Sequence, residues 1–146
     1  MKLLVALILA LAFAEQDRAQ VAPQTCPDSV AFTRIAAEKA LETKKKLVAD
    51  FEKSFPKSNH LPEAFMDLSR ALIAASDFAA ARQFADKAVA AVSRMKSAAA
   101  ADPNSNAALQ EWLLSMESAT KKNQEWVTQM IAWREQQVRS SVLGKR

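Results

Sequence analysis

Glycine is almost missing from this chain, and its absence limits the folds that the chain can adopt. Gly144 is the single glycine, and there is no tyrosine among the 146 residues. Strand-rich proteins need glycine in their tight turns and bulges, and β-branched or aromatic residues on their pleated surfaces. Alanine runs throughout the sequence instead, with leucine, lysine, glutamate and glutamine, which favour helices. The sequence therefore predicts an all-α fold, and half of its residues are apolar, enough for a buried core.

The N-terminus has the pattern of a secretory signal peptide. Lys2 supplies a positive start, and the apolar run of residues 3–14 ends in an A-x-A cleavage site at Ala14. This run is shorter than the roughly 20 residues that span a bilayer. Cleavage is predicted after Ala14, with Ala19 or Ala22 as later sites and an uncleaved anchor helix as the alternative. We therefore expect a secreted or periplasmic location, and the short leader favours a bacterial cell envelope.

Three further regions follow the signal peptide. Residues 15–27 are polar and aperiodic and are predicted to be a disordered leader. A helical domain is expected over residues 28–141, with residues 142–146 as a tail. The first helix of this domain is predicted to start with Asp28 as its N-cap and to run without a break to Pro56. It ends there because proline cannot donate the next backbone hydrogen bond.

Two helices joined by a short turn are predicted in the middle of the chain. One covers residues 62–75, and the other covers residues 78–95 and can extend to the stop at Pro103. Asp77 lies just before the second helix and is expected to be its N-cap. Both helices carry an apolar stripe, so they are predicted to pack as an antiparallel hairpin. One hairpin cannot bury both of its sides, and the flanking helices are therefore expected to stack on it.

The C-terminal segment, residues 105–141, has no glycine or proline and shows a seven-residue repeat. Two rows three positions apart make up the repeat: Leu109, Met116, Asn123 and Met130, and Trp112, Ala119, Trp126 and Trp133. Such rows are typical of a heptad seam between helices. The segment is either one long helix or a hairpin broken near residues 121–123. The hairpin is preferred, because a single helix of this length would overhang so small a core.

Several residues of the predicted hairpin follow a known repeat pattern. Large apolar residues recur in its first helix, an Asp-Phe pair opens its second helix, and small residues follow: Phe65, Leu68, Leu72, Asp77, Phe78, Ala81, Ala88 and Val89. Through them the segment 62–95 resembles a tetratricopeptide repeat, a 34-residue helix–turn–helix unit. Residues 55–58 and 62–64 are similar to the variant found in bacterial envelope proteins of this class. Ser69 and Ser76 replace the two usual glycines, Ala85 replaces a common large aromatic residue, and no proline closes the unit. A plain helical bundle is the alternative.

The resemblance implies a short array of stacked hairpins with a concave groove lined by the first helix of the hairpin. The exposed residues of this groove would be Glu63, Met66, Arg70 and Ile73. They would suit an extended peptide or a partner helix that offers apolar anchors and a charge pair.

No catalytic, metal or cofactor site can be assembled from the motifs of this sequence. His60 and Cys26 are the single residues of their types, and neither lies in a ligand or nucleophile motif. His60 is expected to be an exposed loop residue, and Cys26 either a free thiol or one half of a bond between chains. The basic run at residues 44–46 is predicted to be a solvated face. Loss of Lys2 with the leader lowers the net charge from +4 to +3, and the basic run has no aromatic neighbours, so nucleic-acid binding is not expected.

The predicted function is that of an exported, non-enzymatic protein–protein interaction module, a scaffold or adaptor that holds a protein or peptide partner. The alternative is a structural helical bundle that self-associates into a homo-oligomer through Trp112, Trp126 and Trp133. Three tryptophans at sevenfold spacing would otherwise pack inside the fold or line an aromatic groove. No membrane span is expected once the leader is removed.

Overall fold

Five helices make up almost all of the part of the chain that the structure describes. The computed structural model describes residues 26–144, of which 84% are helical and none lie in a strand. The helices are α2 (Pro27–Ala37), α3 (Leu41–Ser54), α4 (Leu61–Ala74), α5 (Phe78–Ala101) and α6 (Ala107–Leu143). The prediction of an all-α fold is therefore confirmed. The predicted signal peptide and residues 15–25 of the predicted leader lie outside the described residues.

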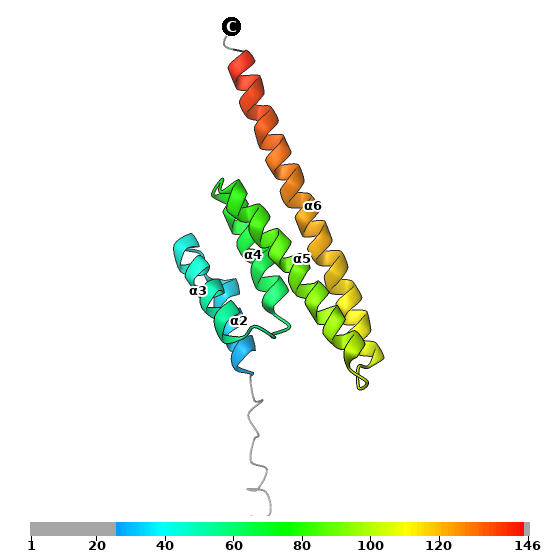
Figure 1. Ribbon diagram of the computed structural model, residues 1–146. Coiled ribbons are helices and arrows are strands. Elements are labelled where there is room, and N and C mark those ends of the chain that lie inside the picture. Colours follow the sequence, from blue (N-terminus) through cyan, green and yellow to red (C-terminus); the bar gives the residue numbers. More distant parts are fainter. Residues whose placement is uncertain (1–25, 145–146) are drawn as a thin grey trace, which may run out of the picture.

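The helices lie in a row, each beside the one that follows it in the chain (Figure 1). The central helix α4 contacts all four others, and α2 also reaches past α3 to touch it. The most extensive contact joins α4 to α5, which run antiparallel as the sequence predicts (Figure 1). The α5–α6 pair is a second antiparallel hairpin that shares α5 with the first.

Small side chains bring α4 and α5 close together. Ala81, Ala85 and Ala88 on α5 have no solvent exposure, and neither do Phe65 and Leu72 on α4. A methyl group at each α5 position lets the large α4 side chains fill the space between the two backbones. Ala85 lies in this seam, where a larger side chain would push the two helices apart.

The turn between α4 and α5 closes with a left-handed residue. Ser76 has φ = 63°, its N–H donates to the Ile73 carbonyl at 3.0 Å, and the Asp77 N–H donates to the Leu72 carbonyl at 2.9 Å. This pair of bonds is a Schellman motif. The Asp77 carboxylate then accepts from the Ala80 N–H at 3.3 Å, so the predicted N-cap is confirmed.

The prediction of one helix from residue 28 to Pro56 is wrong, because the chain breaks at residues 38–40. Glu38 is extended, and its carboxylate accepts from the Ala40 N–H at 2.7 Å. The break lets Ile35 join Val48 in one buried cluster. In an unbroken helix these two residues would lie about 20 Å apart. The first helix also starts slightly earlier than predicted, with Cys26 as N-cap and Pro27 in the first turn.

The prediction that residues 105–141 form a hairpin is also wrong. The segment is the single helix α6, and it stays helical to Leu143, two residues into the predicted tail. Its length is about 55 Å at 1.5 Å per residue, and it extends well beyond the α4–α5 turn (Figure 1). The overhang of a single long helix beyond the small core, which favoured the hairpin in the sequence analysis, is therefore a feature of the fold.

Candidate protein-interaction surfaces

The groove predicted on α4 is not open. Met66 and Ile73 are 7% and 8% exposed, so the prediction that both face solvent is wrong. They belong to the same buried cluster as Met116 and Val127 of α6, which shows that α6 packs against this part of α4. Of the other two predicted residues, Glu63 is half-buried and Arg70 is exposed. The four residues therefore do not form one accessible binding face.

A small polar cluster joins α4 to α6 within this contact. Asn123 is buried, and its amide nitrogen donates to the Ser69 hydroxyl at 3.0 Å. The amide oxygen of Asn123 accepts from Arg70 Nε at 3.0 Å, and Ser69 Oγ donates to the Met66 carbonyl at 2.8 Å. Two sequence signals pointed to this site: a serine at a usual glycine position and an asparagine in an apolar heptad row. Nothing in the sequence itself places residues 69 and 123 together.

Two side chains near the start of the domain differ from their predicted surroundings. Lys44 is buried and forms an ion pair with Asp67 of α4, so the basic run is not a fully solvated face. His60 is half-buried rather than exposed. Its ring stacks on Phe32 with centroids 4.8 Å apart, and its Nε2 lies 3.1 Å from Ser29 Oγ. Both contacts fasten the N-terminal helices to α4.

Two carboxylates of the described residues are held by hydrogen bonds between parts of the fold. No group of three or more His, Cys, Asp or Glu side chains in residues 26–144 could hold a metal ion. Hydrogen bonds from Lys96 of α5 (2.6 Å) and Lys121 (3.1 Å) lower the pKa of Glu117. A hydrogen bond from the Ser58 hydroxyl likewise lowers the pKa of Asp28. These carboxylates are held in their ionised form between helices.

The predicted tryptophan seam is divided between two environments. Trp112 is half-buried, whereas Trp126 and Trp133 are 40% and 52% exposed. The other heptad row faces inward, because Met116 and Asn123 are buried against α4 and α5. The two tryptophans that remain accessible lie one heptad apart on the upper half of α6.

The projecting end of α6 is the most extended unpartnered surface of the described chain. Every residue from 132 to 144 is exposed. Its large apolar side chains are Trp133, Val138, Val142 and Leu143. Where the projection leaves the bundle, Ile131 and Val138 line a shallow hollow of about 410 Å³ together with Phe78 of α5. Exposed apolar side chains grouped at the end of a helix are typical of an interaction site, and Val138 and Val142 lie one turn apart on one face of this end.

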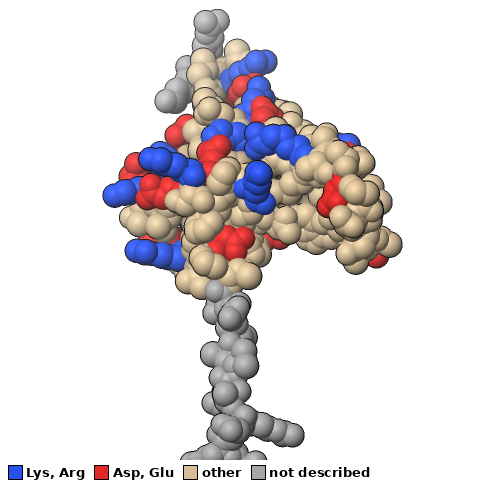
Figure 2. Space-filling view, turned by 60° about the horizontal axis from the view of Figure 1, so that its bottom comes forward, with Lys and Arg blue, Asp and Glu red and all other residues tan. Residues whose placement is uncertain are grey.

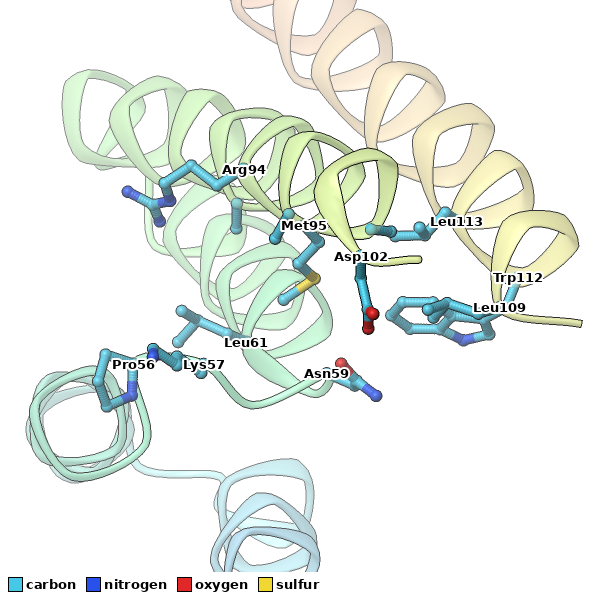
Figure 3. Close-up of a pocket in the computed structure, with 13 residues that line it drawn as sticks. Pro56, Lys57, Asn59, Leu61, Arg94, Met95, Asp102, Leu109, Trp112 and Leu113 are labelled. Carbon is cyan, nitrogen blue, oxygen red and sulfur yellow. The ribbon is translucent and has the colours of Figure 1, made fainter. Parts of the chain in front are cut away.

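A larger pocket lies at the opposite end of α6 (Figure 3). It has a volume of about 500 Å³ and is bounded by the α3–α4 connection, the second half of α5 and the first turns of α6. Figure 2 shows that the lobe on its right, where α5 ends and α6 begins, carries few charged side chains. Lysines, arginines and acidic residues crowd the other side of the same view.

Comparisons with known proteins give no relative for this chain. No family model, no curated protein and no solved structure matches it. Within residues 26–144, none of the helices has the length and apolar character needed to cross a membrane.

Proposed function

We propose that this chain is an exported, non-enzymatic interaction module of the cell envelope that holds a partner protein on the projecting end of α6. The observation that carries the proposal is the run of exposed residues 132–144, in which Val138 and Val142 lie one turn apart on the same face of α6. A helix that leaves its own bundle with apolar side chains in solvent gains free energy by burying them against another protein. The row of packed hairpins supports a scaffold role, since stacked helices hold the projection in a fixed direction.

The net positive charge of the C-terminal sequence favours a partner with acidic groups. Residues 131–146 contain Arg134, Arg139, Lys145 and Arg146 against the single acid Glu135, a net charge of four minus one, or +3. An amphipathic helix with acidic residues beside its apolar stripe would match both features. Such a helix would lie along α6 and enter the hollow beside Phe78.

Two pairs of aspartate substitutions test this proposal on the same helix. Val138→Asp with Val142→Asp places charge in the apolar stripe, whereas Gln136→Asp with Ser140→Asp makes the same charge change on the opposite side of α6. We expect the first pair to abolish capture of the partner from envelope extract, and the second pair to retain it. Equal capture by both variants, with unchanged helical circular dichroism, would show that the projection is not the binding surface.

Self-association is the second candidate, and exposed Trp126 and Trp133 favour it. Half-buried Trp112 can contribute little to a contact with another copy. Sedimentation velocity over a wide concentration range separates the two functions. A dimer that is lost in Trp126→Ala with Trp133→Ala supports self-association, while a monomer at every concentration removes it. The net charge of +3 over the sequence of residues 131–146 works against pairing two copies, especially at low salt.

Export has its own test. N-terminal sequencing of the chain recovered from the periplasm or medium should begin at Glu15 if cleavage follows Ala14. A chain that stays in the cytoplasm with Met1 intact would remove the envelope from the proposal.

A further inference from the structure

The half-open pocket in Figure 3 has the volume of a small-molecule site. Its volume of about 500 Å³ lies within the roughly 300–1,000 Å³ of typical ligand pockets. Three separate parts of the chain form its walls: the α3–α4 connection, α5 and α6. No motif in the sequence indicates such a site, because its walls come from residues 56–61, 91–102 and 109–113 and contain no ligand motif.

Small residues on α5 create the space. Ala91, Ala98 and Ala99 line the pocket where α5 continues past the beginning of α4. Longer side chains complete the walls, and most of them are aliphatic: Pro56, Leu61, Met95, Leu109, Trp112 and Leu113. An alkyl chain placed here would gain about 0.8 kcal/mol for each buried methylene group.

The charged groups of the pocket are separated by sign. Figure 3 shows Lys57 and Arg94 on one side, Asp102 and Trp112 on the other, and Met95 between them. Neither Lys57 nor Arg94 forms an ion pair with any residue of the described part of the chain. Lys87 and Lys96, on the same helix as Arg94, are both paired with acids. Both cations are exposed, so they place two unpaired positive groups at the rim of the apolar pocket.

We propose that this pocket binds a small apolar anion, an alkyl carboxylate of medium length. The carboxylate lies between Lys57 and Arg94, and the alkyl chain runs past Met95 toward Trp112. Asp102 repels a carboxylate and so sets the orientation, with the apolar end on the tryptophan side. The site is independent of the surface on the far end of α6, and each can fail without the other.

Dodecanoate, used below its micelle concentration, is a suitable probe for the full chain. Isothermal titration calorimetry should give saturable binding of one dodecanoate per chain. In a Trp126→Phe, Trp133→Phe background, Trp112 becomes the only tryptophan, and its emission should change with the same saturation curve. Absence of saturable binding to the parent chain overturns the proposal.

Variants of the pocket decide whether the binding is specific. Lys57→Glu with Arg94→Glu should weaken dodecanoate binding at least about tenfold, since two attractive contacts become repulsive. Ala98→Phe should block the cavity from an exposed position, leaving the core intact. Lys53→Glu, an exposed charge reversal on α3 outside the pocket, is the matched control and should bind as the parent does.

Two further outcomes would refute the proposal. If dodecan-1-ol binds as tightly as dodecanoate, the cations do not recognise the carboxylate. If the charge-reversed pair binds as tightly as Lys53→Glu, the anion lies elsewhere on the chain. Thermal melting by circular dichroism accompanies each variant, so that a loss of binding is scored only in folded protein.

Discussion

Ser76 is the residue whose backbone conformation is least suited to its side chain. It is the one non-glycine residue with positive φ in residues 26–144, and it occupies the helix end where glycine is the usual choice. The left-handed conformation costs an L-residue roughly 1–2 kcal/mol. The resemblance to a tetratricopeptide repeat predicts a glycine at this position. The position could therefore be found from the sequence, although its dihedral angle could not.

We predict that Ser76→Gly raises the free energy of unfolding by about 1 kcal/mol, because glycine adopts positive φ without a steric penalty. Urea denaturation followed by circular dichroism measures the change. Ser97→Gly in the exposed interior of α5 is the control and should lower the free energy of unfolding by about 0.5 kcal/mol. A loss of stability in Ser76→Gly would contradict the assignment of a strained turn.

Glu117 makes the stability of the α5–α6 contact depend on pH. Lys96 and Lys121 hold its pKa below the ordinary value of 4.5. The folded state therefore favours the carboxylate, and the resulting stabilisation is complete above about pH 4.5 and is lost as the pH falls through the lowered pKa. We expect Glu117→Gln to be less stable than the parent at pH 7, with the difference shrinking on acidification.

The measurement is a series of urea titrations between neutral and strongly acidic pH. Glu111→Gln is the control, because the Glu111 carboxylate is exposed on α6 and makes no ion pair within the described chain. A gap between Glu117→Gln and the parent that stays constant down to the lowest pH would argue against these ion pairs.

At the scale of the helices, α6 shows where sequence reasoning reached its limit. The heptad spacing correctly predicted helix, and the absence of glycine and proline fits its continuity, but only one of the two rows of the predicted seam faces inward. The break was placed near residue 123 because polarity peaks there. In the fold, however, Ser69 and Arg70 satisfy the buried Asn123 amide, so the helix needs no interruption. That partner lies 54 positions away in the chain, beyond any local pattern.

The break between α2 and α3 was missed for a related reason. Residues 38–40 contain neither glycine nor proline, and local preference favours a helix there. Packing prevails over this preference, because only a bent chain brings Ile35 into the core that contains Val48 and Phe51. By contrast, the first residues of α4 and α5 were predicted to within one residue, because proline, serine and aspartate stand at these boundaries.

A proline at Lys122 tests the continuity of α6. Lys122 is exposed in the middle of the helix, so its side chain contributes little to packing. We predict that Lys122→Pro lowers the free energy of unfolding by about 3 kcal/mol or more, since it removes a backbone hydrogen bond and clashes with the preceding turn. Lys122→Ala, the control, should change it by less than about 0.5 kcal/mol. A near-neutral proline would instead indicate a loop at this point.

At the scale of the whole molecule, the row of helices has a weak end and a strong centre. Ile35 is the single buried residue of α2, whereas nine residues of α4 are buried. The N-terminal helix is tied down mainly by its contacts with the α3–α4 connection, through Asp28 with Ser58 and Phe32 with His60. Because α2 contacts only α3 and α4, this end can open without unfolding the centre.

Hydrogen–deuterium exchange should resolve this gradient. We predict that amides of α2 exchange faster than those of α4 and α5. Ile35→Ala should raise the exchange rate in α2 by about tenfold or more, because the lost burial of about 2–5 kcal/mol lowers the free energy of local opening of α2. Exchange in α4 and α5 should stay close to the parent.

Leu72→Ala is the control, because Leu72 is an equally buried residue of the central helix. It should instead raise exchange in every helix. If Ile35→Ala accelerates all five helices equally, the described chain opens as one cooperative unit, and α6 would then be held by the whole bundle rather than by α4 and α5 alone.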